Sequence, residues 1–265
     1  MGKALEVLNG FSTAPSTTFT ALTMASGTSS TVRNARPDSR IRLLQCWADN
    51  QGAGALRIRS PQMHDNVQGI RLNVVASEVQ PLLPDNLIQP LQPQDQLTLE
   101  NTGSATAGDI ESAGFLLWYE DLVGVAGRFV TADEVRKRGI NLLTVENTIT
   151  TGTAGNFSGE EAINAEFDLL RANTDYAIAG YLVSAECCSV RWRGVDFGNL
   201  GVGGPGFDTG RFVTKGWFMD LSDYFGIECV PVFNSANKAG TLVDAAQDEN
   251  GTDVTVTTIL IELAD

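Results

Sequence analysis

The sequence is short of the side chains that most often carry out chemistry in enzymes. Histidine occurs once in 265 residues, as His64. A Ser-His-Asp or Cys-His site would have to use it, and a metal-dependent cupin barrel needs several histidines on facing strands. His64 precedes Asp65 between two expected strands, where a histidine bonded to local backbone is the simpler interpretation. We therefore expect no enzyme, no catalytic residue and no cofactor.

Cysteine is also scarce, with four examples, namely Cys46, Cys187, Cys188 and Cys229. Two of them are neighbours in the sequence, and adjacent cysteines rarely bond to each other. The spacing matches neither a disulfide framework nor a zinc site. Buried free thiols in a reducing compartment are the expected state.

Positive charge is limited as well, since 18 Lys and Arg stand against 32 Asp and Glu, for a formal net charge of −14. An acidic surface repels phosphates, so direct binding of nucleic acid is not expected. No run reaches the roughly 18 apolar residues of a membrane span, and residues 1–11 lack the apolar centre of a secretory signal. We expect a soluble chain that is made and assembled in a cytoplasm.

What the sequence does contain is a series of short strand patterns separated by some of its 27 glycines. Residues 55–59 (ALRIR) alternate apolar with charged side chains, which predicts a half-buried strand. Residues 114–120 (GFLLWYE) are almost continuously apolar, which is typical of a strand covered on both faces. Further strands are expected at 18–24, 41–48, 67–75, 96–100, 176–184, 189–193, 217–220, 229–233 and 254–263.

Two segments have the pattern of helices. In Thr131–Gly139, Thr131 is a candidate N-cap with Glu134 three residues later, and a glycine closes the segment. In Ser158–Asn173, apolar residues recur at spacings of three and four. The proline-rich residues 76–95 and the glycine-rich run 198–206 are expected to be loops or edges.

A long stretch of the chain resembles another stretch further on. Residues 40–72 lie over residues 175–207, and within them Leu56-Arg57-Ile58-Arg59 lies over Val190-Arg191-Trp192-Arg193, an offset of 134 between 56 and 190. Extending the match places 97–101 over 230–234 and 115–120 over 257–262, offsets of 133 and 142. The jump in offset predicts an insertion in the second copy's polar loop at 247–253. The chain is therefore interpreted as a duplication.

Two units of 120 to 130 residues with seven or eight short strands each have the size of sandwiches or jelly rolls. We predict an all-β fold of two tandem jelly-roll barrels, with residues 1–130 as the first barrel and its N-terminal arm, 131–140 as a helical linker and 141–265 as the second barrel.

Few residues stand out as contact candidates. Arg57 and Arg59 share one side of a strand, as do Arg191 and Arg193. They fit either a solvent face that resists strand slippage or ion pairs to carboxylates across a subunit boundary. The acidic residues 244–253 offer oxygen ligands for calcium, but without the EF-hand order, so a solvated loop is favoured.

The duplicated architecture, together with the segments HDNVQGIRL (64–72) and GFLLWYEDL (114–122), resembles the double jelly-roll major capsid proteins of tailless icosahedral viruses of the corticovirus and tectivirus kind. That resemblance covers essentially the whole chain. It implies three copies in a pseudo-hexameric capsomer, a virion location, and contacts with a penton protein and an internal viral membrane. Residues 1–11 would be a terminal arm that contacts neighbouring copies through Leu5, Val7 and Leu8.

A second reading is a tandem β-sandwich that binds carbohydrate or a cell surface. Trp118, Trp192 and Trp217 could stack on sugar rings, although all three fall in expected strands, where tryptophan is more often part of the core.

Overall fold

The computed structural model describes residues 2–13, 16–24, 31–33, 35, 41–50, 53–62, 69–75, 78–81, 91–103, 106, 110–150, 152–185, 187–207, 214–247 and 251–264. Within these residues the chain is mostly β-strand, and every strand pairing is antiparallel. The expected all-β class is therefore confirmed.

The first half of the chain forms two sheets. Its strands are β1 (Ala4–Ser12), β2 (Thr20–Ala21), β3 (Thr23–Met24), β4 (Ile41–Asp49), β5 (Ala53–Arg59), β6 (Ile70–Val75), β7 (Glu78–Pro81), β8 (Thr98–Thr102) and β9 (Glu111–Tyr119). One sheet has the order β3-β1-β9-β4-β7 and the other β2-β8-β5-β6.

The second half repeats this arrangement. Its elements are β10 (Phe129–Val130), α1 (Ala132–Arg138), β11 (Gly139–Thr150), β12 (Glu161–Ala162), β13 (Asp175–Val183), β14 (Cys187–Arg193), β15 (Val202–Gly206), α3 (Trp217–Phe225), β16 (Val230–Asn234), the 3₁₀ helix η2 (Ser235–Gly240), β17 (Leu242–Ala246) and β18 (Asp253–Leu263). The sheet orders are β10-β16-β13-β18-β11 and β12-β17-β14-β15. Strand β10, which a boundary at residue 130 assigns to the first unit, thus pairs with β16 of the second.

Both halves follow one pairing rule. If β2 and β3 are counted as one strand position and the edge strand β10 is left out, each half has eight positions. First pairs with eighth, second with seventh, third with sixth and fourth with fifth: β1 with β9, β2 with β8, β4 with β7 and β5 with β6 in the first half, and β11 with β18, β12 with β17, β13 with β16 and β14 with β15 in the second. The eighth strand also pairs with the third, and the seventh with the fourth. Each half is thus one long four-pair hairpin curled into two sheets.

The structure supports the internal repeat, because equivalent strands of the two halves lie at the offsets expected from the sequence. Strands β5 and β14 begin at 53 and 187, the expected offset of 134. The third strands carry a bulge at matching places, between Leu43 and Gln45 in β4 and between Ile178 and Gly180 in β13, an offset of 135 from 43 to 178. That offset is the one at which 40–72 lies over 175–207.

Two details of the expected repeat are wrong. Residues 97–101 and 230–234 fall in the seventh strand of the first half and the sixth of the second, so β8 matches β17 instead. In the last strands, Leu43 pairs with Leu117 and Ile178 with Leu260, which makes the offset 143, from 117 to 260, in place of 142. A slip of one residue moves every side chain to the opposite face, so only the pairing decides between them.

The predicted insertion is also misplaced. The extra residues of the second half lie between β15, which ends at 206, and β16, which begins at 230, whereas β6 and β7 are separated only by residues 76–77. This insertion contains α3. The segment from 247 to 252 is no longer than its counterpart between β8 and β9, which runs from 103 to 110.

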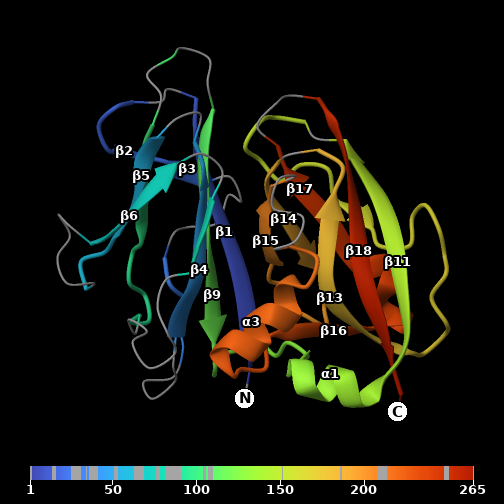
Figure 1. Ribbon diagram of the computed structural model, residues 1–265. Coiled ribbons are helices and arrows are strands. Elements are labelled where there is room, and N and C mark those ends of the chain that lie inside the picture. The colour runs from blue at the N-terminus through green and yellow to red at the C-terminus, as the bar shows by residue number, and fades with distance from the viewer. Residues whose placement is uncertain are drawn as a thin grey trace.

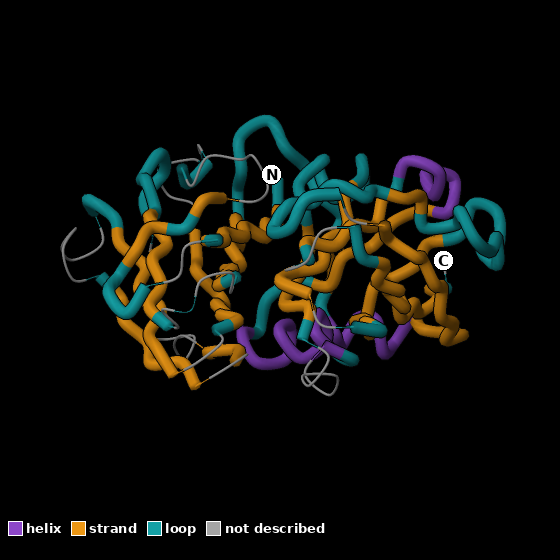
Figure 2. The backbone as a smooth tube through the Cα atoms, turned by 90° about the horizontal axis from the view of Figure 1, so that it is seen from above, coloured by secondary structure: helices purple, strands orange, loops and turns teal. Residues whose placement is uncertain are grey.

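The four sheets stack as four layers (Figure 1), and Figure 2 shows the strands gathered in two adjacent blocks. The β1-β9 sheet of the first half packs on the β14-β15 sheet of the second. At this junction Val7 N donates to Gly201 O at 2.8 Å, and the Trp47 indole donates to Ser189 Oγ at 3.1 Å. Trp47 also meets Trp217 edge-on. One hydrophobic cluster runs from this junction through the second half, and a separate cluster fills the first.

The helix expected at Thr131–Gly139 is confirmed as α1. Thr131 Oγ1 accepts a hydrogen bond from Glu134 N at 3.1 Å, which satisfies one of the free N–H groups at the helix start. The chain then continues directly into β11. No helix in the described part of the chain combines the length and the apolar composition needed to cross a membrane.

The strand expected at 217–220 is wrong, because this segment is the beginning of α3. Its apolar residues Trp217, Phe218, Leu221 and Phe225 are buried at helical spacing. Helix α3 packs beside α1, where Ala132 N donates to Ser222 Oγ at 2.9 Å.

The helix expected at 158–173 is also wrong. The segment contains the two-residue strand β12 followed by turns. Ile163 and Leu170 are buried while Phe167 is 57% exposed, so the apolar side chains do not share one face. The glycine-rich run is likewise more than a loop, because Val202–Gly206 forms β15.

Candidate functional site

The first arginine pair singled out in the sequence belongs to a compact cluster on the outer face of the β2-β8-β5-β6 sheet. Arg57 Nε and Arg59 Nη2 each donate to Glu100 on β8, both at 2.5 Å. The Arg57 guanidinium also lies 4.0 Å from the centroid of the Phe19 ring, a cation–π contact. Burial acts to raise the pKa of Glu100, but the hydrogen bonds from Arg59 and Arg57 outweigh it, so the pKa is lowered. Glu100 is therefore a stable carboxylate between two guanidinium groups.

The second arginine pair builds an equivalent cluster on β14. Arg191 Nη2 donates to Asp244 on β17 and to Glu160, both at 3.0 Å, and Arg193 donates to Glu160 at 2.6 Å. Arg191 lies 4.1 Å from the centroid of the Phe157 ring. Asp244 is only 1% exposed, and burial raises its pKa by more than Arg191 lowers it.

The two clusters have the same arrangement of an arginine and a carboxylate at equivalent positions of the two halves. Arg57 lies directly opposite Glu100 in the pairing of the fourth and seventh strands, and Arg191 lies directly opposite Asp244 in the equivalent pairing. Opposite charges across a strand pair favour one register over a slipped one. The clusters therefore fix how the fourth and seventh strands align in each half.

Within the chain these arginines pair with the carboxylates of Glu100, Glu160 and Asp244. The hypothesis that they also reach carboxylates of another subunit stays a prediction.

The N-terminal arm expected at residues 1–11 does not exist as an arm, because residues 4–12 form β1, the first strand of the first half. Leu5, Val7 and Leu8 are 0%, 3% and 1% exposed. Leu8 packs in the core of the first half, whereas Leu5 and Val7 pack in the cluster that spans the junction. Side chains this deeply buried offer no surface to another copy.

The tryptophans proposed as sugar platforms are buried. Trp118 and Trp217 are each 3% exposed and Trp192 is fully buried. Trp192 donates to Thr258 Oγ1 at 3.1 Å and contacts Tyr181 and Phe218. The carbohydrate-binding reading therefore loses the feature that suggested it.

Sequence reasoning missed the partners of the arginines. Glu100 follows Leu97-Thr98-Leu99, so the alternation alone places it on the solvent side of its strand. Phe19 and Phe157 come just before the second strand of their halves, a position that becomes apparent only once the strands are matched. The repeated arginine–carboxylate pairing could have been found from the sequence if β8 had been aligned with β17 instead of with residues 230–234.

Other candidates carry no site in the described part of the chain. His64 lies outside the described residues, as do residues 248–250 of the acidic segment considered for calcium. Asp244 of that segment is on β17 and is bonded to Arg191. Among the described residues, no group of three or more His, Cys, Asp or Glu side chains is arranged to hold a metal ion.

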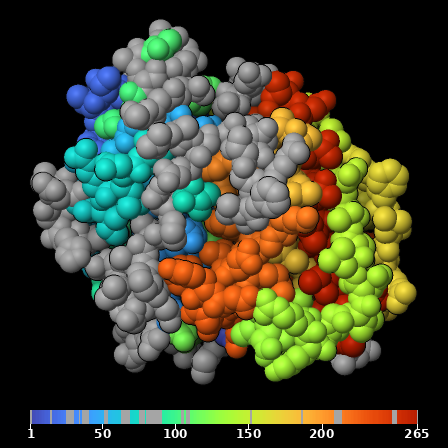
Figure 3. Space-filling view, in the orientation of Figure 1, coloured from blue at the N-terminus to red at the C-terminus, as the bar shows by residue number. Residues whose placement is uncertain are grey.

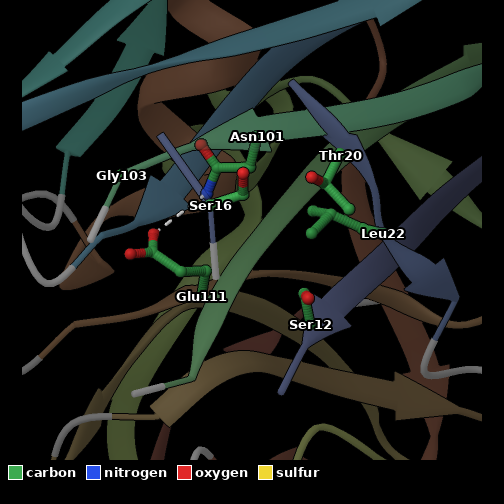
Figure 4. Close-up of a pocket in the computed structure, with 7 residues that line it drawn as sticks. All are labelled: Ser12, Ser16, Thr20, Leu22, Asn101, Gly103 and Glu111. Carbon is green, nitrogen blue, oxygen red and sulfur yellow. Dashed lines mark hydrogen bonds between the residues drawn. The ribbon is translucent and has the colours of Figure 1, made fainter. Parts of the chain in front are cut away.

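One small cavity lies between the two sheets of the first half, beside Asn101 and Glu111 (Figure 4). Its volume is about 10 Å³, roughly the space of one water molecule. Asn101 Nδ2 donates to Glu111 at 3.3 Å there. A cavity of this size cannot hold a substrate.

Comparison with solved structures finds distant likenesses, of which two are described here. No family model and no curated protein matches the chain. The crystal structure of the PBSX exported protein XepA is 11% identical, over 96% of this chain and 86% of that one, with a TM-score of 0.26. A chain from Sulfolobus turreted icosahedral virus is 9% identical, over 99% of this chain and 91% of that one, with a TM-score of 0.23. Values this low carry no weight for the fold or the role of this chain.

Proposed function

We propose that this chain is a structural protein of a virion, a double jelly-roll major capsid protein whose copies assemble as trimers into pseudo-hexameric capsomers. The observation that carries the proposal is the strand order. In each half the first, eighth, third and sixth strands lie in one sheet, with β3 or β10 added at its edge. The second strand (β2 or β12) and the seventh, fourth and fifth strands form the other sheet. An eight-stranded, two-sheet unit with this connectivity has the form of a jelly roll.

The repetition of this unit supports a role in tiling. Two similar blocks per chain and three chains per ring give six similar blocks, so one gene product can occupy the positions of a hexagonal lattice. The two halves are joined by a continuous hydrophobic cluster, so each chain enters the lattice with its two blocks already docked.

The charge of the chain supports a shell that does not bind the genome directly. A formal net charge of −14 opposes contact with phosphates. Further partners belong to the same proposal: other copies in the lattice, a penton protein at the vertices and an internal viral membrane.

Light scattering coupled to size-exclusion chromatography tests the proposal. We expect a particle with three times the mass of one chain, and negative-stain electron microscopy of it should show a six-lobed ring. A protein that remains monomeric at every concentration reached would contradict the assembly.

A further inference from the structure

The way in which the two halves of the chain pack together suggests how two copies of the chain could pack together. Within the chain, the outer face of the β1-β9 sheet is covered by the outer face of the β14-β15 sheet. The equivalent faces elsewhere are the outer face of the β11-β18 sheet and that of the β5-β6 sheet. They are the two end layers of the stack, at opposite sides of the molecule (Figure 1).

The end face on β11 carries an apolar side chain at the position that is buried in the junction. Leu5 pairs with Trp118 across β1 and β9, and Leu142 pairs with Ile261 across β11 and β18. The offset of 143 that links the eighth strands maps Trp118 onto Ile261, so Leu142 is the counterpart of Leu5. Leu5 is 0% exposed, whereas Leu142 is 66% exposed. The outer face of the β1-β9 sheet is therefore buried in the junction, whereas the equivalent face of the β11-β18 sheet is exposed to solvent.

The same mapping places Glu146 at the position that Asn9 occupies in the first half. Asn9 pairs with Gly114, and Glu146 pairs with Thr257, again 143 positions apart from 114 to 257. At the junction, Asn9 Oδ1 accepts a hydrogen bond from Ser189 Oγ on β14 at 2.8 Å. Glu146 is exposed, and no cation pairs with it among the described residues.

The opposite end face has charges that complement Glu146. The residue that corresponds to Ser189 is Ala55, two positions before Arg57 on β5. Arg71 on β6 lies directly opposite Arg57, and like charges facing each other across a strand pair are unfavourable. Phe19 lies close to both guanidinium groups, at 4.0 Å and 5.3 Å. Arg71 is exposed and has no carboxylate partner in the described part of the chain.

We propose that the Leu142–Glu146 face of one copy packs on the Arg57–Arg71 face of the next, in the way that β1-β9 packs on β14-β15 within the chain. Such a contact is head-to-tail, so it closes a ring when the rotation between copies permits and otherwise continues as a filament. Figure 3 shows β6 in turquoise on the left side of the molecule and β11 in yellow-green on the right side. The inference rests on the proposed self-assembly and names the surfaces that meet.

Charge reversal with rescue tests the pairing. Arg71→Glu and Glu146→Arg should each weaken self-association by roughly tenfold or more, because each places like charges in the interface. The double variant Arg71→Glu/Glu146→Arg should return to within roughly threefold of the original protein, since opposite charges face each other again. Lys137→Glu on α1 makes the same change in net charge as Arg71→Glu, at an exposed residue away from both faces, and should have no effect.

The apolar part of the interface has its own variant. Leu142→Ser should weaken association while leaving the thermal unfolding temperature of the isolated chain unchanged, because Leu142 is already solvent-exposed. Val195→Ser, at a residue that is 57% exposed outside both faces, is the matched control.

The two possible failures are distinguishable by sedimentation equilibrium. If the original protein stays monomeric, the proposed assembly fails and this interface fails with it. If the original protein assembles but the single variants associate equally well, or the double variant shows only the sum of both losses, the assembly stands and this interface is wrong.

Discussion

Trp47 of the first half and Trp217 of the second meet edge to face, with ring centroids 6.2 Å apart and ring planes at 85°. Trp47 lies on the outer face of one sheet, and Trp217 begins the helix inserted between β15 and β16. The Trp47 indole also bonds to Ser189 Oγ on β14. These contacts join the two halves into one unit.

Replacing Trp47 should weaken this union. Trp47→Ala should lower the free energy of unfolding by about 3–5 kcal/mol, because it opens a large cavity at the junction. Urea unfolding followed by circular dichroism should then show the two halves melting in separate transitions. Trp192→Phe removes an indole bond that lies wholly within the second half, so it should lower stability without separating the transitions. A single sharp transition for Trp47→Ala would show that other contacts join the halves.

The lowered pKa of Glu100 predicts a definite dependence of stability on pH. The carboxylate form is favoured in the folded state, so its contribution is fully present above the unfolded pKa of about 4.3 and is lost as pH falls through the lower folded value. Glu100→Gln should cost about 1.5–3 kcal/mol near pH 7, the range for a hydrogen bond to a charged group, and this cost should shrink towards pH 3. Urea midpoints measured between pH 3 and pH 7 test the sign.

Asp244 should behave in the opposite way, although it occupies the equivalent position. Its pKa is raised by burial, so the folded state binds the proton more tightly and the contribution of this group to stability falls as pH rises through the folded pKa. The cost of Asp244→Asn should therefore be smaller at neutral pH than that of Glu100→Gln. Equal costs and equal pH profiles for the two variants would contradict the different burial of the two carboxylates.

Gly204 should not tolerate a side chain. A Cβ there would lie 2.5 Å from the Tyr181 hydroxyl and 2.6 Å from the Trp217 indole nitrogen. Gly204→Ala should destabilise the protein by about 1–3 kcal/mol through overpacking. Gly240→Ala is the control, because a Cβ at that residue meets no atom within 4 Å. Thermal unfolding of both variants compares them directly.

All four cysteines are free and buried, as expected from their spacing. Burial raises the pKa of the Cys46 and Cys229 thiols well above the ordinary value. The native protein should therefore react with a disulfide reagent such as DTNB only as fast as it unfolds. Fast stoichiometric labelling under native conditions would contradict this packing.

Local sequence determined the strands whose evidence is local, whereas β1, β11 and β17 were not among the expected strands. The alternation of Leu56, Arg57, Ile58 and Arg59 predicts both the strand and which side faces solvent, and the structure agrees. Thr131, Glu134 and Gly139 likewise define α1 through hydrogen bonds within a few residues. The repeat of Arg57-Ile58-Arg59 as Arg191-Trp192-Arg193 could be seen in the sequence because it also rests on local alternation.

Which strand pairs with which was decided only by the tertiary structure. Residues 97–101 and 230–234 resemble each other because both are short apolar strands, yet they occupy the seventh and sixth positions of their halves. Trp217–Phe225 forms a helix whose apolar residues are buried, and Trp217 contacts Trp47 of the first half. Leu5 looked like part of a free arm, and only the pairing of β1 with β9 buried it. The alternation of apolar and polar residues in a strand shows that one face is buried. Which sheet covers that face depends on residues more than a hundred positions away in the sequence, as for Trp47 and Ser189.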